Sequence, residues 1–181
     1  MAPDVMENSL SLFAQGVPQV DGHYLLLLAS RLLHVLSAII LLGGIFYLGT
    51  IVGPALGSAG TADSWYSGRR AAWAKWVGIT TLLLIATGLF NFITNVKTYE
   101  IAISYHMLVG LKILVALVVF FFAAVLAGRS GLAERLRANM KFWLTICLIA
   151  GIITVAIGSV MRTYPRTPKA ISAPTLIAPN N

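Results

Sequence analysis

Apolar residues fill four long stretches of this chain, and polar residues separate them. The stretches cover residues 32–52, 76–95, 105–127 and 142–161. Each is close to the roughly 20 residues that a helix needs to cross the ~30 Å hydrocarbon core of a bilayer. Only structures that satisfy their own backbone hydrogen bonds can span lipid, and helices do so. The pattern therefore predicts an all-α fold, an integral membrane four-helix bundle.

The remaining segments set the predicted organisation. We expect residues 1–30 to form an N-terminal extracytoplasmic segment, residues 31–163 to form one transmembrane domain, and residues 164–181 to form a flexible C-terminal tail. The short loop of residues 96–104 makes the second and third spans antiparallel neighbours. In residues 128–141, leucine and methionine residues have the spacing of a short surface helix.

Composition agrees with a membrane location and limits the partners. Hydrophobic residues make up 58% of the chain and charged residues 10%, and the mean hydropathy is +0.85. Soluble domains contain about 25% charged residues, so a water-soluble domain is excluded. The net charge of +7 comes from loops between spans, where retention in the cytoplasm explains it without nucleic acid. We expect the lipid bilayer as partner, together with other membrane subunits or a second copy of the chain.

The distribution of lysine and arginine predicts the topology. The first and third loops with their flanks carry more of these residues than the opposite side, which favours both termini on the same, non-cytoplasmic side of a bacterial cytoplasmic (inner) membrane. The richer side holds Arg69, Arg70, Lys75, Arg129, Arg135, Arg137 and Lys141, and the other holds Arg31, Lys97, Arg162, Arg166 and Lys169.

The single cysteine, Cys147, lies in the middle of the fourth stretch. One cysteine excludes an intrachain disulfide and a cysteine-rich metal site. We expect it to serve as a small packing residue.

Ionisable residues are rare in the stretches and gather toward one end of the predicted bundle. His34 and Lys112 lie inside spans, and His106 lies at the start of one. His34 is 19 residues from Gly53, while Lys112 and His106 are 16 and 22 residues from Gly128. At a rise of about 1.5 Å per residue, the three groups fall within ~4.5 Å in height. Ionisable groups at such depth indicate a functional site.

Arg31 and Arg162 add positive charge near this end. No Asp or Glu lies within a span to neutralise Lys112, so an anionic ligand, a group of carbonyls or loss of the proton must do so. Simpler interpretations also exist. Arg31 and His106 would sit at the membrane interface, and Ser37 or a carbonyl would satisfy His34.

Several cofactors would use this arrangement. Haem b ligated by His34 and His106 is one, with Arg31, Lys112 or Arg162 pairing with its propionates. A copper ion is another, because imidazole suits copper. Proton-coupled quinone or porphyrinogen chemistry would use a His–Lys pair, with Lys112 as the candidate catalytic residue.

Several motifs resemble a known family. The run from Arg69 to Trp76 (Arg-Arg-Ala-Ala-Trp-Ala-Lys-Trp), the run Ala86-Thr87-Gly88-Leu89, and the run from Tyr105 to Lys112 resemble the copper resistance D (CopD) membrane family. The first span, with His34 followed by Gly-Gly-Ile-Phe-Tyr-Leu, is similar to both CopD and the related HemJ-type protoporphyrinogen oxidases. The resemblance covers about residues 30–128.

The resemblance implies a four-helix bundle with His34 and Lys112 as the functional pair. It implies haem and porphyrinogen oxidation in the HemJ group and copper handling in the CopD group. The chain lacks two histidines of the HemJ pattern. Gly49-Thr50-Ile51-Val52-Gly53 stands where the HemJ group has a second histidine after the Phe-Tyr-Leu run, and Gly110 stands where that group has a histidine two residues before the lysine. We expect a CopD/HemJ-like protein that binds haem b or copper in redox or metal handling. The alternative is a cofactor-free accessory or scaffolding subunit of a larger membrane complex.

Overall fold

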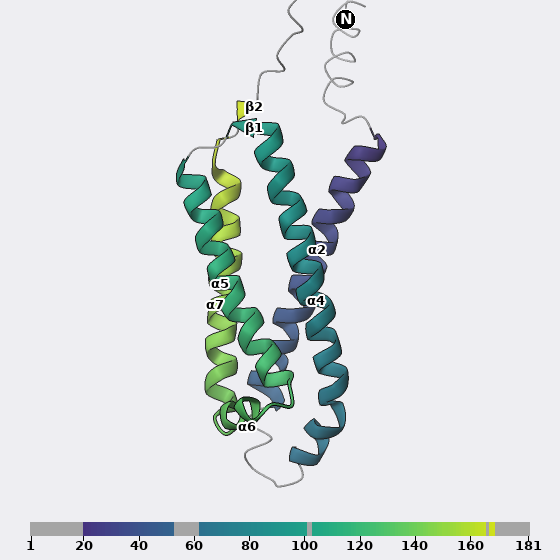
Figure 1. The fold of residues 1–181 in the computed structure, drawn as a ribbon, viewed down its shortest axis with the longest axis vertical. Coiled ribbons are helices and arrows are strands. Elements are labelled where there is room, and N and C mark those ends of the chain that lie inside the picture. The colour runs from purple at the N-terminus through teal and green to yellow at the C-terminus, as the bar shows by residue number, and fades with distance from the viewer. Residues whose placement is uncertain (1–19, 53–61, 101–102, 166, 169–181) are drawn as a thin grey trace, which may run out of the picture.

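Four long helices dominate the protein (Figure 1). The computed structural model describes residues 20–52, 62–100, 103–165 and 167–168. The described elements, in chain order, are α2 (Gly22–Tyr47), the π-helical continuation η1 (Leu48–Val52), α4 (Ala62–Thr98), β1 (Tyr99–Glu100), α5 (Ile103–Ala127), α6 (Gly131–Arg137), α7 (Met140–Thr163) and β2 (Thr167–Pro168). Four helical segments are long and apolar enough to cross a membrane: α2–η1, the part of α4 from Gly68 to Thr98, α5 and α7. The predicted all-α bundle of four membrane-spanning helices is confirmed.

The bundle consists of two helix pairs. α2 packs most extensively on α4, and α5 packs most extensively on α7, with smaller contacts between the pairs. The start of α2 and the end of α7 lie at the same end of the bundle, where β1 and β2 form a short antiparallel pair (Figure 1). We call this the β1–β2 end and the opposite one the α6 end. The side of the membrane that each end faces stays a prediction.

Two helices begin earlier than hydropathy predicts. α2 starts at Gly22 rather than near residue 32, because Asp21 caps it by accepting a hydrogen bond from the backbone N–H of Tyr24 at 2.7 Å. α4 starts at Ala62 rather than near residue 76. Part of the predicted N-terminal segment is therefore helical. Residues 1–19, and the predicted flexible tail apart from its first two residues and β2, lie outside the described residues.

The predicted short surface helix is confirmed as α6. Its N-cap is Ser130, whose hydroxyl accepts a hydrogen bond from the Ala133 N–H at 3.2 Å. Arg137 at its other end donates to the carbonyls of Leu126 at 3.3 Å and Gly128 at 2.8 Å. These bonds satisfy carbonyl groups at the end of α5 and turn the chain toward α7.

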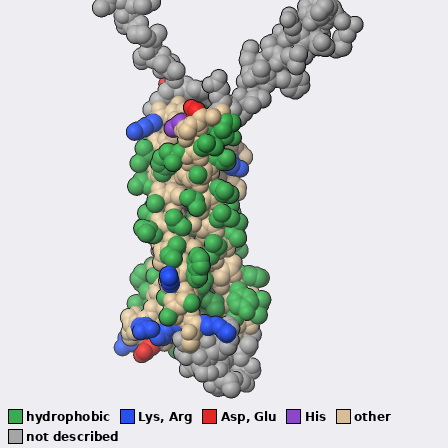
Figure 2. Space-filling view, turned by 90° about the vertical axis from the view of Figure 1, so that its right-hand side faces the viewer, with side chains coloured by type: hydrophobic (Ala, Val, Ile, Leu, Met, Phe, Trp, Pro, Cys, Tyr) green, Lys and Arg blue, Asp and Glu red, His purple; other side chains and the backbone are tan. Residues whose placement is uncertain are grey.

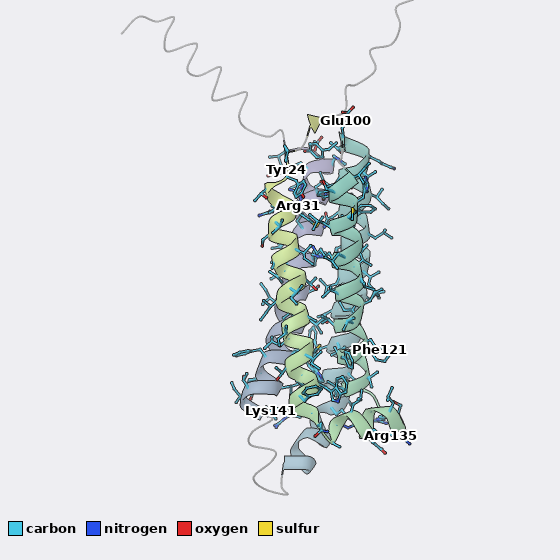
Figure 3. The ribbon with its side chains drawn as sticks, turned by 90° about the vertical axis from the view of Figure 1, so that its left-hand side faces the viewer. Tyr24, Arg31, Glu100, Phe121, Arg135 and Lys141 are labelled. Carbon is cyan, nitrogen blue, oxygen red and sulfur yellow. The ribbon has the colours of Figure 1, made fainter. Side chains whose placement is uncertain are left out.

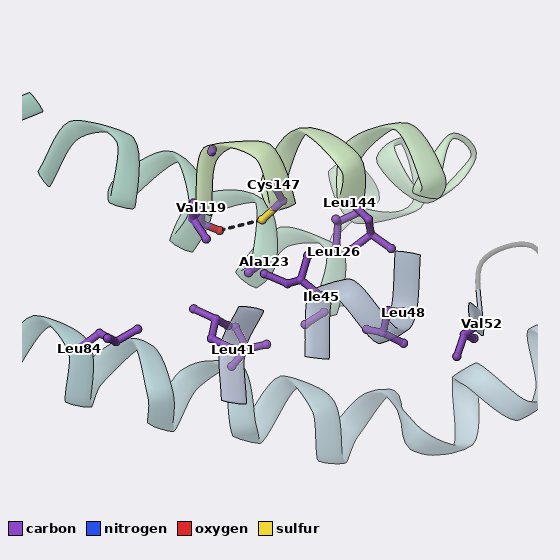
Figure 4. Close-up of a cluster of buried hydrophobic side chains, with 13 residues drawn as sticks. Leu41, Ile45, Leu48, Val52, Leu84, Val119, Ala123, Leu126, Leu144 and Cys147 are labelled. Atoms are coloured by element: carbon purple, nitrogen blue, oxygen red, sulfur yellow. Dashed lines mark hydrogen bonds between the residues drawn. The ribbon is translucent and has the colours of Figure 1, made fainter. Parts of the chain in front are cut away.

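Two clusters of buried apolar side chains hold the bundle together. The larger cluster lies toward the α6 end and contains residues of all four long helices (Figure 4). Cys147 is fully buried in it, and its thiol donates a weak hydrogen bond to the Val119 carbonyl at 3.5 Å. The smaller cluster lies toward the β1–β2 end, around Tyr105, Val109 and Met161. The level between the clusters contains the partly buried side chains of His34 and Lys112.

The outer surface suits a bilayer. Large hydrophobic side chains are exposed along all four long helices, and they cover the middle of the molecule in Figure 2. Lysine and arginine gather near the α6 end in the same view. Apolar faces of this extent are found in proteins that contact lipid or other proteins. The chain is thus an integral membrane protein.

Candidate functional site

His34 is held in the interface between α2 and α4. Its side chain is partly buried, and its Nδ1 atom lies 2.9 Å from the Thr87 hydroxyl oxygen. The backbone of Leu84 also lies within hydrogen-bonding reach of the ring. The imidazole is therefore bound along one edge by a turn of α4.

The hydrogen bonds of Thr87 determine which nitrogen of His34 carries the proton. The Thr87 hydroxyl donates its only proton to the Leu83 carbonyl of its own helix. Toward His34 it is therefore an acceptor, and His34 Nδ1–H is the donor. In the neutral imidazole this leaves Nε2 unprotonated, so that its lone pair can bind a ligand.

A glycine on α4 provides the space for this ring. A Cβ atom placed at Gly88 would lie 3.2 Å from His34 Cε1 and 3.7 Å from Nδ1. Any larger side chain would press on the imidazole edge that faces α4. Gly88 and Thr87 together therefore position His34, one by leaving room and the other by hydrogen bonding.

Lys112 lies between α5 and α7 in a similar way. Its side chain is partly buried, and a Cβ atom placed at Gly158 would lie 3.1 Å from Nζ and 3.7 Å from Cε. The ammonium group thus rests against the glycine surface of α7. Among the residues that the structure describes, none accepts a hydrogen bond from Lys112.

The structure brings His34 and Lys112 together, each from a different helix pair. Lys112 lies close enough to His34 for their charges to interact. The described parts of the four spans contain no Asp or Glu. The interior between the two apolar clusters therefore carries basic groups without acidic ones, which favours an anionic or electron-pair-accepting ligand.

Polar side chains continue along the α2–α4 interface. The four buried polar residues among those described, Ser30, Ser37, Thr80 and Thr87, all belong to these two helices. Ser30 donates to the Asn91 side-chain oxygen at 3.3 Å, about one helical turn nearer the β1–β2 end than His34. The α2–α4 interface is consequently the polar interface of the bundle.

His106 does not join this pair. Its side chain is exposed, and its ring packs edge-on against Phe92 at 6.3 Å and Tyr105 at 6.4 Å between centroids. Phe92 lies four residues beyond Gly88 on α4, so His106 sits about 6 Å nearer the β1–β2 end than His34. Ligation of one cofactor by both histidines stays a prediction.

The two predicted arginines are exposed, unlike His34 and Lys112. Arg31 is exposed on α2 near the β1–β2 end (Figure 3). Arg162 is exposed in the last turn of α7. Both positions suit side chains that reach the membrane interface.

Sequence reasoning did not assign roles to Thr87, Gly88 or Gly158. Thr87 and Gly88 belong to a run that the family resemblance includes, and Gly158 belongs to a repeat of small residues on α7. Matching depths across antiparallel spans would have put Thr87 near His34, but only the helix register shows the contact. Matching depths would likewise have placed Asn91 near Ser30.

The donor set fits some cofactors better than others. Histidines that ligate metals usually donate their second ring N–H to a neighbouring acceptor, as His34 does through Nδ1. His34 would therefore be able to hold haem iron through Nε2. Within the described residues, no group of three or more His, Cys, Asp or Glu side chains gathers around one point. A copper ion bound by His34 would therefore find few other strong ligands among the described residues.

No family model matches the chain, and no similar protein was found among curated proteins or solved structures. The CopD/HemJ resemblance therefore stays a prediction.

Proposed function

We propose that this chain is a CopD/HemJ-like membrane protein that binds a haem-type tetrapyrrole between its two helix pairs and acts in redox or metal handling. The observation that carries the proposal is the hydrogen bond between His34 Nδ1 and Thr87. It leaves Nε2 unprotonated and holds the ring in one orientation. A histidine nitrogen that binds a metal inside a membrane bundle needs both a free lone pair and a fixed ring orientation.

Lys112 complements His34 in this proposal. An ammonium group in an apolar interior is stabilised by an anion, and the propionates of a tetrapyrrole are anions on a large apolar body. Haem b would supply one-electron redox chemistry when bound. The protein's own contribution would be to ligate through His34, to orient that ring through Thr87, and to exclude water with the two apolar clusters.

The proposed setting follows from the apolar exterior and the charge distribution. A bacterial inner membrane, with the α6 end in the cytoplasm, fits the basic residues at that end. The wide exposed apolar faces leave room for a second copy or for other membrane subunits beside the lipid.

The experiment is an absorbance spectrum of the detergent-purified protein, expressed with haem supply, together with its copper content. We expect a Soret band that His34→Ala abolishes. Thr87→Val should weaken or shift the band, because the ring loses its anchor. His106→Ala should leave the band in place, since His106 lies about one turn away and is exposed.

Other outcomes distinguish the alternatives. A band lost in both histidine variants would support the two-histidine ligation expected from sequence. A colourless protein that carries copper would favour the copper site. A colourless protein without copper, even after addition of haem, would overturn the proposal in favour of an accessory subunit.

A further inference from the structure

Lys112 has hydrogen-bond donors for which the described residues supply no acceptor. Its Nζ carries three N–H groups, and no described residue accepts from it. The side chain begins nine residues inside α5 and is partly buried, so water reaches it less easily than it reaches the arginines at the helix ends. A cation in this position gains most from an acceptor that carries negative charge.

The described residues around the ammonium group also include no competing acid. The described parts of the spans contain no carboxylate, and the other ionisable group nearby is the basic His34. Gly158 carries no side chain, so Nζ can rest directly against the surface of α7.

We infer that Lys112 and the glycine surface at Gly158 form a carboxylate-binding subsite, which anchors one acidic group of an apolar ligand. The inference rests on the proposed function for the identity of that ligand, a tetrapyrrole whose propionate binds here. The sequence leaves three cations open as partners for such a group. Burial selects Lys112, because its side chain is partly buried and within electrostatic range of His34, whereas Arg31 and Arg162 are exposed.

The test compares haem b with its dimethyl ester, in which both carboxylates are neutral. Binding is measured by absorbance titration of purified protein in detergent. We expect the wild-type protein to bind the acid about tenfold to a hundredfold more tightly than the ester, as a hydrogen bond to a charged group predicts. In Lys112→Gln this preference should fall close to one, while the affinity for the ester stays the same.

Glycine variants provide a second test in case Lys112→Gln does not fold. A methyl group at Gly158 would meet Nζ at 3.1 Å, whereas Gly110, on the same helix as Lys112, has nothing within 4 Å of its Cβ position. Gly158→Ala should therefore reduce the preference for the acid, and Gly110→Ala should keep it. Arg31→Gln and Arg162→Gln should also keep it.

A fluorescent long-chain fatty acid and its methyl ester form a separate arm that needs no tetrapyrrole. Preference for the fatty acid that depends on Lys112 would support the subsite even if the protein binds no haem, and would separate this inference from the proposed function. Loss of haem binding in His34→Ala with the acid preference of the fatty acid intact would support both. Equal binding of acid and ester in both arms, or an unchanged preference in folded Lys112→Gln, would overturn the inference.

Discussion

The contact between Gly44 of α2 and Trp73 of α4 offers the most direct test of the helix packing that positions His34. A Cβ atom at residue 44 would overlap the Trp73 ring at Cη2 and Cζ3. Carbon atoms pack at about 3.5–4.0 Å, so Gly44→Ala requires a displacement of more than about 1 Å. Trp73 is partly buried and packs against the larger apolar cluster, so its rigid ring has little freedom to move.

Gly44→Ala should therefore lower the free energy of unfolding by about 1–3 kcal/mol, the usual cost of overpacking. The matched control is the neighbouring Gly43→Ala, whose Cβ position has nothing within 4 Å. Alanine is the better helix former, so this variant should be neutral or more stable by up to about 1 kcal/mol. The assay is unfolding by SDS in mixed micelles, followed by tryptophan fluorescence or circular dichroism.

The two variants change adjacent residues by the same methyl group, so their difference isolates the contact with Trp73. Equal stability of Gly44→Ala and Gly43→Ala would show that α2 does not approach α4 along this face. The same result would remove the basis for the contact between His34 and Thr87, because one helix register produces both.

Two further predictions concern the polar interface. Nitrogen-15 NMR of histidine-labelled protein, with His34→Asn to assign the signal, should show neutral His34 protonated at Nδ1. In Thr87→Val the population of the Nδ1–H tautomer should fall about threefold to tenfold relative to the other tautomer. A proton on Nε2 in the wild-type protein would contradict the assignment. Ser30→Ala should destabilise the protein by about 0.6 kcal/mol, the average for hydrogen bonds between membrane helices. Ser159→Ala is its control, since that exposed hydroxyl bonds only to its own helix, and equal unfolding curves for the two serine variants would argue against the bond to Asn91.

The fold was predictable because lipid allows few alternatives. Four apolar stretches of sufficient length can only be helices when they cross a bilayer, and their short connections leave an antiparallel bundle. The start of α2 was not predictable from hydropathy, because it depends on the cap at Asp21 and not on apolar residues. Helix capping and the limit of the hydrocarbon layer are different physical boundaries.

The candidate site was predictable only in part. His34 and Lys112 stand out from sequence alone because an ionisable side chain within a membrane span costs free energy. Counting residues from the span ends gives their approximate depth. The same count gives His106 nearly the same depth, but it contains no information on rotation about the helix axis. Because α5 is apolar nearly all round, the sequence could not indicate that His106 is exposed while Lys112 is partly buried.

The α2–α4 interface is polar and the α5–α7 interface is apolar, and this difference supports a ligand-binding role for Lys112. α2 and α4 contain all four buried polar residues described, and hydrogen bonds between Ser30 and Asn91 and between His34 and Thr87 satisfy several of their groups. The α5–α7 pair is apolar at its core, and Lys112 is a partly buried cation in it without a bonding partner among the described residues. A lysine that served only to stabilise α5 against α7 would be replaced without loss by an apolar residue of similar volume. Lys112 lies instead at the junction of the polar and apolar helix pairs, within electrostatic range of His34. A ligand that is apolar over most of its surface and acidic at one edge would contact both helix pairs there.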